Sequence, residues 1–207
     1  MASRYHHGHL RQALLDASRE ILAESGARGL SLREAARRAG VSTAAPYRHF
    51  QDKQSLLIAL AHQGFVRLDG ELSAVAQACA SEGRDPLDTV ASLGVAYVDF
   101  AARHGPEFRL MFGELAPDPR ASEELEQAVG AVSNHLSSAI GVLADDSPAA
   151  AEELILLAWS LVHGLSTLYL DGHLQRFGEL EAEALAARII GLLNAALRGE
   201  LVLSPSA

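Results

Sequence analysis

Apolar residues recur along most of this chain at the spacing expected for helices. Near the N-terminus, Leu10, Leu14, Ala17 and Ile21 follow one another at steps of four, three and four residues, which places them on one helix face. Gly26 follows as a candidate C-terminal cap of this helix. Nowhere does the chain alternate β-branched or aromatic residues with polar ones, as a half-buried strand would. The pattern predicts an all-α protein.

Two short helices separated by a tight turn are predicted next. Ser31 and Glu34 have the spacing of a capping box, in which each side chain bonds to the backbone amide of the other residue. The helix that follows is short, because Gly40 can adopt the left-handed conformation that ends it. Ser42 offers a new N-cap, so another short helix is expected to begin within two or three residues. Two such helices joined by residues 39–42 are typical of a helix-turn-helix unit.

Further helix starts are marked by capping side chains that directly precede a proline, at Asp85, Asp118 and Ser147. Proline at the first helical position loses no backbone hydrogen bond, so each pair predicts a start. Asp52 marks one more start, and Gly178 marks a break. The helices predicted after residue 51 cover residues 52–81, 86–103, 107–113, 119–142, 148–171 and 179–198.

One predicted helix is unusually apolar, because residues 154–170 contain no Asp, Glu, Lys or Arg. The segment is slightly short for a membrane span, and His163 and Gly164 lie near its middle. We interpret it as a buried helix and expect no membrane association.

The last two long helices each carry an apolar stripe with steps of four and three residues. The stripes consist of Leu154, Ala158, Leu161, Leu165 and Leu168 in the first helix, and of Leu185, Ile189, Leu192 and Ala196 in the second. Two such stripes are expected to form a four-helix bundle with their copies in a second chain, which predicts a homodimer. The alternative is that both stripes fill the core of a single chain.

Charge divides the chain into two parts, although the formal charge of the whole chain is −9. Residues 1–67 contain 10 Lys and Arg against 5 Asp and Glu, whereas residues 68–207 contain 7 against 21. A small basic unit beside an acidic one fits polyanion binding by the basic unit, because cations that neutralise phosphates release condensed counterions. The two parts are therefore expected to bind different partners.

The segment from residue 41 to residue 53 combines small residues with polar side chains that can reach DNA. The small residues come first on the predicted helix, so its N-terminal end can approach base edges closely. Tyr47, Arg48 and His49 then offer a hydroxyl, a forked guanidinium and an imidazole. Lys53 adds a cation beside amides at the start of the next helix, which attract anions. This combination indicates double-stranded DNA as the partner.

The stretch Tyr5–Leu57 resembles the three-helix DNA-binding domain of the tetracycline-repressor (TetR) family. The likeness rests above all on the pattern Val-Ser-x-x-x-x-Tyr-x-His-Phe-x-x-Lys-x-x-Leu-Leu, which begins at Val41. It implies a transcription regulator, usually a repressor, that binds a palindromic operator as a homodimer. Pro46 departs from the pattern, because many members have an ordinary helix former there, and it removes one backbone hydrogen bond from the first helical turn.

The resemblance also assigns residues and domains. It implies a helix-turn-helix domain in residues 1–67 and a helical ligand-binding and dimerisation domain in residues 68–207. Phosphate contacts are implied for Ser31, Tyr47, His49 and Lys53, and base contacts for Thr43, Ala44, Ala45 and Arg48. Packing against the first helix is the alternative for Tyr47 and His49. Our hypothesis is that a small-molecule effector bound to the acidic part moves the two reading helices out of register.

The acidic part contains candidate residues for binding that effector. The run Trp159–Gly164 resembles the Trp-His-Gly pattern that names one C-terminal domain type of the same family. Side chains that mix apolar area with a few polar tips are typical of small-molecule pockets. The candidate pocket residues are Tyr97, Phe100, His104, Phe108, Met111, Trp159 and His163. A hydrogen-bonded core histidine is the alternative for His163, and plain core packing is the alternative for the aromatic residues.

Other function classes find little support in the sequence. We find no glycine-rich phosphate loop, no Gly-x-Ser-x-Gly elbow and no His-Glu-x-x-His pair, so we do not predict an enzyme. His6, His7 and His9 have no cysteine or nearby carboxylate to complete a metal site, and we predict neither a metal nor a cofactor. The single cysteine, Cys79, favours a reducing cytoplasm and lacks a cationic neighbour that would support a redox role. A purely architectural helical protein remains an alternative.

Overall fold

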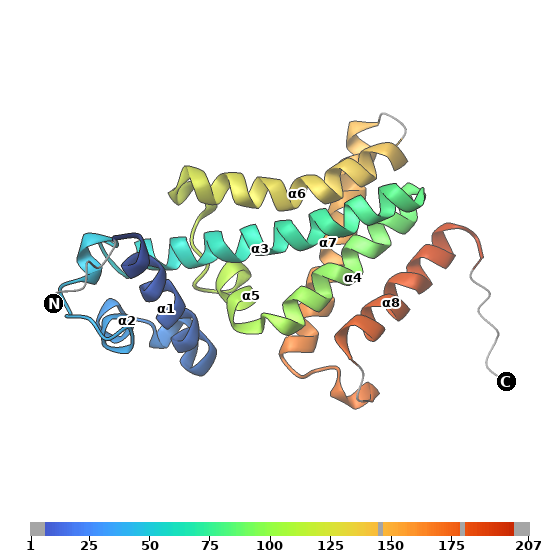
Figure 1. The fold of residues 1–207 in the computed structure, drawn as a ribbon. Helices are drawn as coiled ribbons and strands as arrows, with labels where there is room; N and C mark the ends of the chain where they lie inside the picture. Colours follow the sequence, from blue (N-terminus) through green and yellow to red (C-terminus); the bar gives the residue numbers. More distant parts are fainter. Residues whose placement is uncertain (1–6, 145–146, 179–180, 201–207) are drawn as a thin grey trace. The chain divides into compact units, whose positions relative to one another are not determined.

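The computed structural model describes residues 7–144, 147–178 and 181–200, with the side chains described from residue 10 onward. Within these ranges it contains eight α-helices, three short 3-10 helices and no strand, which confirms the predicted all-α fold (Figure 1). The α-helices are α1 (His7–Gly29), α2 (Leu32–Arg38), α3 (Lys53–Glu82), α4 (Pro86–Arg103), α5 (Gly105–Phe112), α6 (Glu123–Leu143), α7 (Pro148–Leu170) and α8 (Ala182–Leu197). The 3-10 helices are η1 (Pro46–Arg48), η2 (Pro119–Ala121) and η3 (Gln175–Phe177). The histidine cluster at positions 6, 7 and 9 lies outside the described side chains.

Three of the predicted helices, α3, α4 and α7, agree with the structure to within one residue at each end. All three begin at a predicted cap, and for α3 Asp52 Oδ1 accepts a hydrogen bond from the amide of Ser55 at 2.8 Å. Asp85 Oδ1 accepts a hydrogen bond from the amide of Asp88 at 2.8 Å, and Ser147 Oγ accepts one from the amide of Ala150 at 3.4 Å. Each side chain satisfies an amide that the first helical turn leaves unpaired.

The predicted start of α6 is wrong by four residues, although the cap was identified correctly. Asp118 Oδ1 accepts from the amide of Arg120 at 2.9 Å, but this cap opens the short helix η2. The chain then extends at Ser122, whose hydroxyl caps α6 by accepting from the amide of Leu125 at 3.1 Å. The last helix, predicted over residues 179–198, begins at Ala182.

The described chain divides into two compact units. Unit 1 contains residues 1–67 and 104–130, and unit 2 contains residues 68–103 and 131–207. One break falls at residue 67, where the sequence division was placed. Residues 104–130, however, pack with the N-terminal part and not with the rest of 68–207. The helices α3 and α6 each contribute residues to both units.

Unit 1 is built around α1, which packs against α2 and α5. Leu14 and Leu15 of α1 and Leu56 of α3 are fully buried, and Leu60 of α3 is almost completely buried. Gly26 was predicted to cap α1, and its φ of 65° interrupts the helix there, but helical residues continue after it to Gly29. The unit therefore has its own hydrophobic core.

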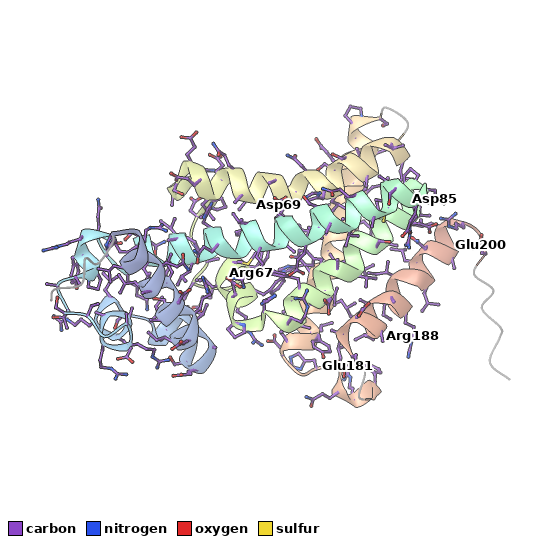
Figure 2. All side chains as sticks on the ribbon, in the orientation of Figure 1. Arg67, Asp69, Asp85, Glu181, Arg188 and Glu200 are labelled. Atoms are coloured by element: carbon purple, nitrogen blue, oxygen red, sulfur yellow. The ribbon has the colours of Figure 1, made fainter. Side chains whose placement is uncertain are left out.

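The α5 helix covers part of unit 1 through an aromatic cluster. The ring of Phe112 lies 5.2 Å from the ring of Phe65 on α3 and 4.8 Å from the ring of Phe108, measured between centroids. Beside this cluster Arg67 donates to Glu107 at 2.6 Å, and Glu107 is only 6% exposed. Figure 2 labels Arg67 on α3. An aromatic contact and a buried ion pair thus join α5 to α3.

Unit 2 is organised around α4, which packs against both α7 and α8 (Figure 1). Gly94 makes this approach possible, because a Cβ at that position would lie 3.0 Å from Ile190 and 3.1 Å from Val162. Arg198, directly after the end of α8, donates to Asp85 at 2.7 Å. Figure 2 labels Asp85 just before the start of α4. The core cluster consists of Val98, Leu165, Ala182, Leu185, Ala186 and Ile190.

The prediction that residues 154–170 form a buried helix is wrong for the single chain. The helix exists as α7, but only 17% of its most apolar 18-residue window is buried. By length and composition α7 is the one helix in the described ranges that passes the test for a membrane span. The sequence prediction failed because an uncharged helix can be covered on one side only, and the chain itself covers one side of α7.

The two predicted apolar stripes are divided between the core and the surface. Leu165 and Leu185 belong to the core cluster of unit 2, as the single-chain alternative required. Leu168 and Leu192, assigned to the same stripes, are 44% and 49% exposed. The exposed side of α7 also includes leucines outside its predicted stripe, at positions 156 and 157.

Candidate nucleic-acid interface

The turn after α2 has the geometry of a Schellman motif. Gly40 adopts a φ of 69° and donates to the carbonyl of Arg37 at 3.2 Å. The next amide, that of Val41, donates to the carbonyl of Ala36 at 3.0 Å. These two bonds satisfy carbonyls at the end of α2 and redirect the chain sharply. The predicted turn between the two short helical segments is confirmed.

The N-terminus of α2 carries half of the predicted capping box. Ser31 Oγ accepts from the amide of Glu34 at 3.2 Å. The Glu34 carboxylate accepts from Arg37 at 2.8 and 2.6 Å, so it bonds to a guanidinium and not to the amide of Ser31. This contact lowers the pKa of the Glu34 carboxyl. Ser31 is half-buried, and its hydroxyl proton can still be donated to an anion at this helix start.

The segment after the turn is not the α-helix that the sequence predicted. Its only helical part is η1, the single 3-10 turn Pro46–Arg48. Pro46 has no N–H, so it cannot donate to the carbonyl of Ser42, which accepts from the amide of Ala45 at 3.0 Å. The sequence predicted only one lost backbone bond here. In so short a segment, that loss is enough to prevent a regular helix.

Most of the predicted DNA-contacting residues in this segment are exposed. Tyr47 is 54% exposed, and Arg48 is exposed beside it. Thr43 and Ala44 are exposed, and Ala45 is half-buried. These five positions therefore lie together on an accessible stretch of unit 1.

His49 differs from its neighbours. It is half-buried, and its Nε2 atom is buried with no hydrogen-bond partner among the described residues. The next residue, Phe50, is 3% exposed and packs into unit 1, with the guanidinium carbon of Arg11 5.5 Å from its ring centroid. The burial of His49 therefore favours the alternative that this side chain packs within unit 1 over a readily accessible phosphate contact.

The cations of this surface fall into two groups. Arg38 is held by α1, since it donates to both carboxylate oxygens of Glu24 at 2.8 and 2.7 Å. The Arg38 guanidinium lowers the pKa of the Glu24 carboxyl. Arg33 and Arg48 are exposed and form no ion pair within the described part of the chain. The second group is the one that can bind phosphate or bases without first breaking a salt bridge.

Lys53 is tied to the backbone of unit 1 in this structure. Its ammonium donates to the carbonyl of Arg28 at 3.3 Å, and the residue is half-buried. Its helix start is fixed by a reciprocal cap, in which Asp52 Oδ1 accepts from the amide of Ser55 at 2.8 Å and Ser55 Oγ accepts from the amide of Asp52 at 3.2 Å. An ammonium has three donors, so two of them stay available for phosphate.

The predicted pocket residues do not belong to one unit. Tyr97, Phe100, Trp159 and His163 lie in unit 2, whereas His104, Phe108 and Met111 lie in unit 1. Phe100, Phe108 and Met111 are buried, and His104 is half-buried. The structure therefore brings only the first four into the same compact unit.

Within unit 2, Tyr97 and His163 form a hydrogen-bonded pair. The Tyr97 hydroxyl lies 3.0 Å from His163 Nδ1, and the indole of Trp159 lies 5.6 Å from the imidazole, measured between ring centroids. Burial raises the pKa of the Tyr97 phenol, and a hydrogen-bond contribution from Trp159 opposes this shift. Burial lowers the pKa of His163. Both shifts favour the uncharged forms, so this cluster is polar but neutral.

Comparisons with known families account for most of the chain. The family described as "Bacterial regulatory proteins, tetR family" matches residues 14–60, which include the helix-turn-helix and the start of α3. The family described as "Tetracyclin repressor-like, C-terminal domain" matches residues 90–198, more than half of the chain. The chain belongs to the TetR family. It is therefore a DNA-binding transcription regulator with a helical ligand-binding C-terminal domain, and the resemblance inferred from the sequence is confirmed.

Solved structures of similar proteins support the same fold. A protein of unknown function from Rhodococcus sp. RHA1 is 34% identical to this TetR-family chain, with a TM-score of 0.76 over 96% of this chain and 98% of that one. A tetR-family regulatory protein from Rhodococcus RHA1 is 22% identical, with a TM-score of 0.66 over 89% and 95% of the two chains. The regulator FadR from Bacillus subtilis, in complex with stearoyl-CoA, is 15% identical, with a TM-score of 0.69 over 89% and 97%. The search of curated proteins gives no match.

Two features of this TetR-family chain were not predicted from the sequence. Arg33 is an exposed cation in the first turn of α2, and its signal was its place two residues after the capping Ser31. No local sequence pattern predicts the buried ion pair of Arg67 and Glu107, because the two residues are 40 positions apart in the chain. Their contact depends on how α5 packs against α3.

Proposed function

We propose that this regulator is a repressor that binds a palindromic operator as a homodimer and leaves it when a small-molecule effector binds. The observation that carries the proposal is the exposed, cation-bearing segment that follows the Schellman turn of unit 1. The guanidinium of Arg48 there forms no ion pair within the described residues and is ready to exchange water for phosphate or base contacts. The effector part of the proposal rests on unit 2.

The DNA contacts are proposed as two sets. Arg48 reads bases, since an exposed guanidinium fork matches the two major-groove acceptors of guanine, and Thr43, Ala44 and Ala45 leave room for close approach. Ser31, Tyr47, His49 and Lys53 bind phosphates and fix the register. Of these, His49 must rotate to expose its buried Nε2 atom.

Homodimer formation through α7 and α8 is supported by their exposed apolar residues. Leu157 and Leu168 of α7 are 51% and 44% exposed, and Leu192 of α8 is 49% exposed. Gly164, one turn before Leu168 on the same side, has nothing within 4 Å of a Cβ built on it, so a second helix can approach closely there. Large exposed apolar side chains gathered on two helices are typical of an interaction site. Two copies would then place two reading segments on the half-sites of a palindrome.

A small-molecule effector is proposed for unit 2. The FadR structure from Bacillus subtilis holds stearoyl-CoA, which shows what that protein binds. In the present chain, the neutral pair of Tyr97 and His163 is a polar feature within mostly apolar surroundings, next to Trp159. Such a combination is typical of effector sites that recognise one polar group of an otherwise apolar molecule. Phe100, the fourth predicted pocket residue in unit 2, is retained as a candidate for this site, whereas His104, Phe108 and Met111 belong to unit 1.

Selection of bound sequences from random double-stranded DNA tests the proposal most directly. We expect enrichment of a palindrome, protection of both half-sites in a footprint, and a dimer in light-scattering measurements. We also expect the protein in the soluble cytoplasmic fraction without detergent. Enrichment of no sequence at low ionic strength would contradict the regulator function, and sequence-independent binding would favour the architectural alternative. Small molecules are then screened for release of the footprint.

A further inference from the structure

Pro46 changes the backbone of the reading segment, which we define as residues 42–50. In an α-helix each amide donates to the carbonyl four residues earlier. Pro46 cannot do so, and the carbonyl of Ser42 instead accepts from the amide of Ala45, three residues later, at 3.0 Å. The first turn of the segment is therefore tighter than an α-helical turn.

The tight spacing continues after the proline. Arg48 donates to the carbonyl of Ala45 at 3.3 Å, and His49 donates to the carbonyl of Pro46 at 2.9 Å. Both donors have shifted from the fourth to the third preceding carbonyl, and the four-residue spacing returns at Phe50, whose amide donates to the carbonyl of Pro46 at 2.9 Å. Tyr47 falls between the two turns, and its amide makes no backbone hydrogen bond within the described chain. In a regular helix that amide would be occupied, because it would donate to the carbonyl of Thr43.

The same shift leaves acceptors unoccupied. The carbonyls of Thr43 and Ala44 accept no backbone hydrogen bond within the described residues, and both residues are exposed. Packing holds the arrangement in place, because Pro46 itself is buried and Phe50, just after the tight turns, is 3% exposed. The reading segment thus presents main-chain donors and acceptors in addition to side chains.

We infer that Pro46 is a specificity-determining residue, because it frees the Tyr47 amide and the Thr43 and Ala44 carbonyls for direct contacts with DNA. The inference rests on the proposed operator binding. Backbone N–H groups bind phosphate oxygens, and main-chain carbonyls can accept from the amino groups that cytosine and adenine present in the major groove. An α-helical reading segment could offer neither group, since both would be used within the helix.

The variant P46A tests this inference, because alanine restores the missing amide and allows the α-helical bonding pattern. We expect P46A to select a different sequence from random duplex DNA, and to bind the wild-type sequence roughly tenfold to a hundredfold more weakly. The matched control is P86A, at the first position of α4 in unit 2, which should select the wild-type sequence. Selection of the same sequence by P46A, with affinity within about twofold of wild type, would overturn the inference.

Hydrogen exchange of the Tyr47 amide provides a second test that does not depend on the variant being folded. In the wild-type protein we expect this amide to exchange rapidly when free and to become protected on the selected DNA. An amide already protected in the free protein, or unprotected in the complex, would contradict the inference while leaving operator binding intact. If the wild type enriches no sequence at all, the proposed function itself fails, and the inference fails with it.

Discussion

Unit 1 and unit 2 differ in how completely the chain covers its own apolar surface. Among the described residues, unit 1 leaves three large apolar side chains exposed, and one of them is Tyr47 in the reading segment. Unit 2 leaves nine exposed, and most of them lie on α7 and α8. Unit 1 instead exposes unpaired cations such as Arg33 and Arg48. Unit 1 buries most of its large apolar side chains and exposes cations. Unit 2 exposes large apolar side chains that a partner could bury.

The largest effect is expected from a charge placed on the uncovered side of α7. Leu157→Glu should leave the single chain folded, because the side chain is 51% exposed, but it should prevent dimer formation. Loss of the second reading segment should weaken operator binding by at least about a hundredfold. Light scattering and gel shifts measure both effects. The control is Val142→Glu, at a residue of α6 that is 70% exposed, and an equal effect of both variants would contradict an interface on α7.

Truncation of a buried aromatic side chain tests whether Phe50 belongs to the hydrophobic core of unit 1. Phe50→Ala should lower the free energy of unfolding by about 3 to 5 kcal/mol, because it removes a buried aromatic side chain and leaves a cavity. Urea denaturation at fixed protein concentration measures the change. Phe177→Ala is the matched control, since this ring is 64% exposed, and its effect should stay below about 0.5 kcal/mol. Similar losses for the two variants would show that Phe50 is not core.

The buried ion pair of unit 1 should contribute less than the aromatic core. Glu107→Ala removes the 2.6 Å contact to Arg67, whose side chain is 34% exposed and can still reach water. We expect a loss of about 1 to 3 kcal/mol in the free energy of unfolding. The exposed pair of Arg28 and Glu114 provides the control, because Glu114→Ala should have almost no effect. A negligible change for Glu107→Ala would mean that α5 is held by its aromatic contacts alone.

Single substitutions on the DNA surface should separate base reading from phosphate binding. Arg48→Ala should alter the preferred bases and weaken specific binding by about 1 to 3 kcal/mol. Lys53→Ala should weaken all sequences alike and reduce the salt dependence of binding by about one charge. Binding titrations at several salt concentrations distinguish the two patterns. Unchanged operator affinity for both variants would show that this surface does not bind DNA.

The smallest expected effect concerns His163 in unit 2. Burial lowers the pKa of this imidazole from its ordinary value of 6.5, so the unfolded chain binds its proton more readily than the folded chain does. The stability therefore falls as the pH drops below 6.5, and the His163→Gln variant should show less of this loss. Urea midpoints at pH 5 and pH 7.5 test the prediction. An identical pH dependence in the variant would assign the effect to other groups.

The sequence predicted those parts of the fold that depend on local chemistry. Asp85 before a proline marks the start of α4, and Gly40 marks the turn after α2, because capping and left-handed backbone conformations involve residues only a few positions apart. The family pattern identified the reading segment for the same reason. The sequence also predicted that Pro46 removes one backbone hydrogen bond. It did not predict that this loss prevents an α-helix, which follows because the segment is so short.

Features that depend on packing between distant segments could not be predicted in the same way. Leu165 and Leu168 belong to one predicted stripe, yet only Leu165 is buried, because the position of α4 decides which side of α7 is covered. An uncharged helix looks the same in sequence whether its own chain or a partner covers it. The pairing of Glu107 with Arg67 likewise follows from the docking of α5, for which no local pattern exists.

The membership of residues 104–130 in unit 1 has a practical consequence for chimeric regulators. A chimera could be made by replacing residues 1–67 with the same part of a relative. That junction would cut through α3 and separate residues 1–67 from α5. Such a graft would strip Phe65 of its contact with Phe112 and leave Arg67 without Glu107. A transplant that carries residues 104–130 along with the first 67 would keep those partners together. For this fold the portable module is discontinuous in the gene, even though the recognition motif is contiguous.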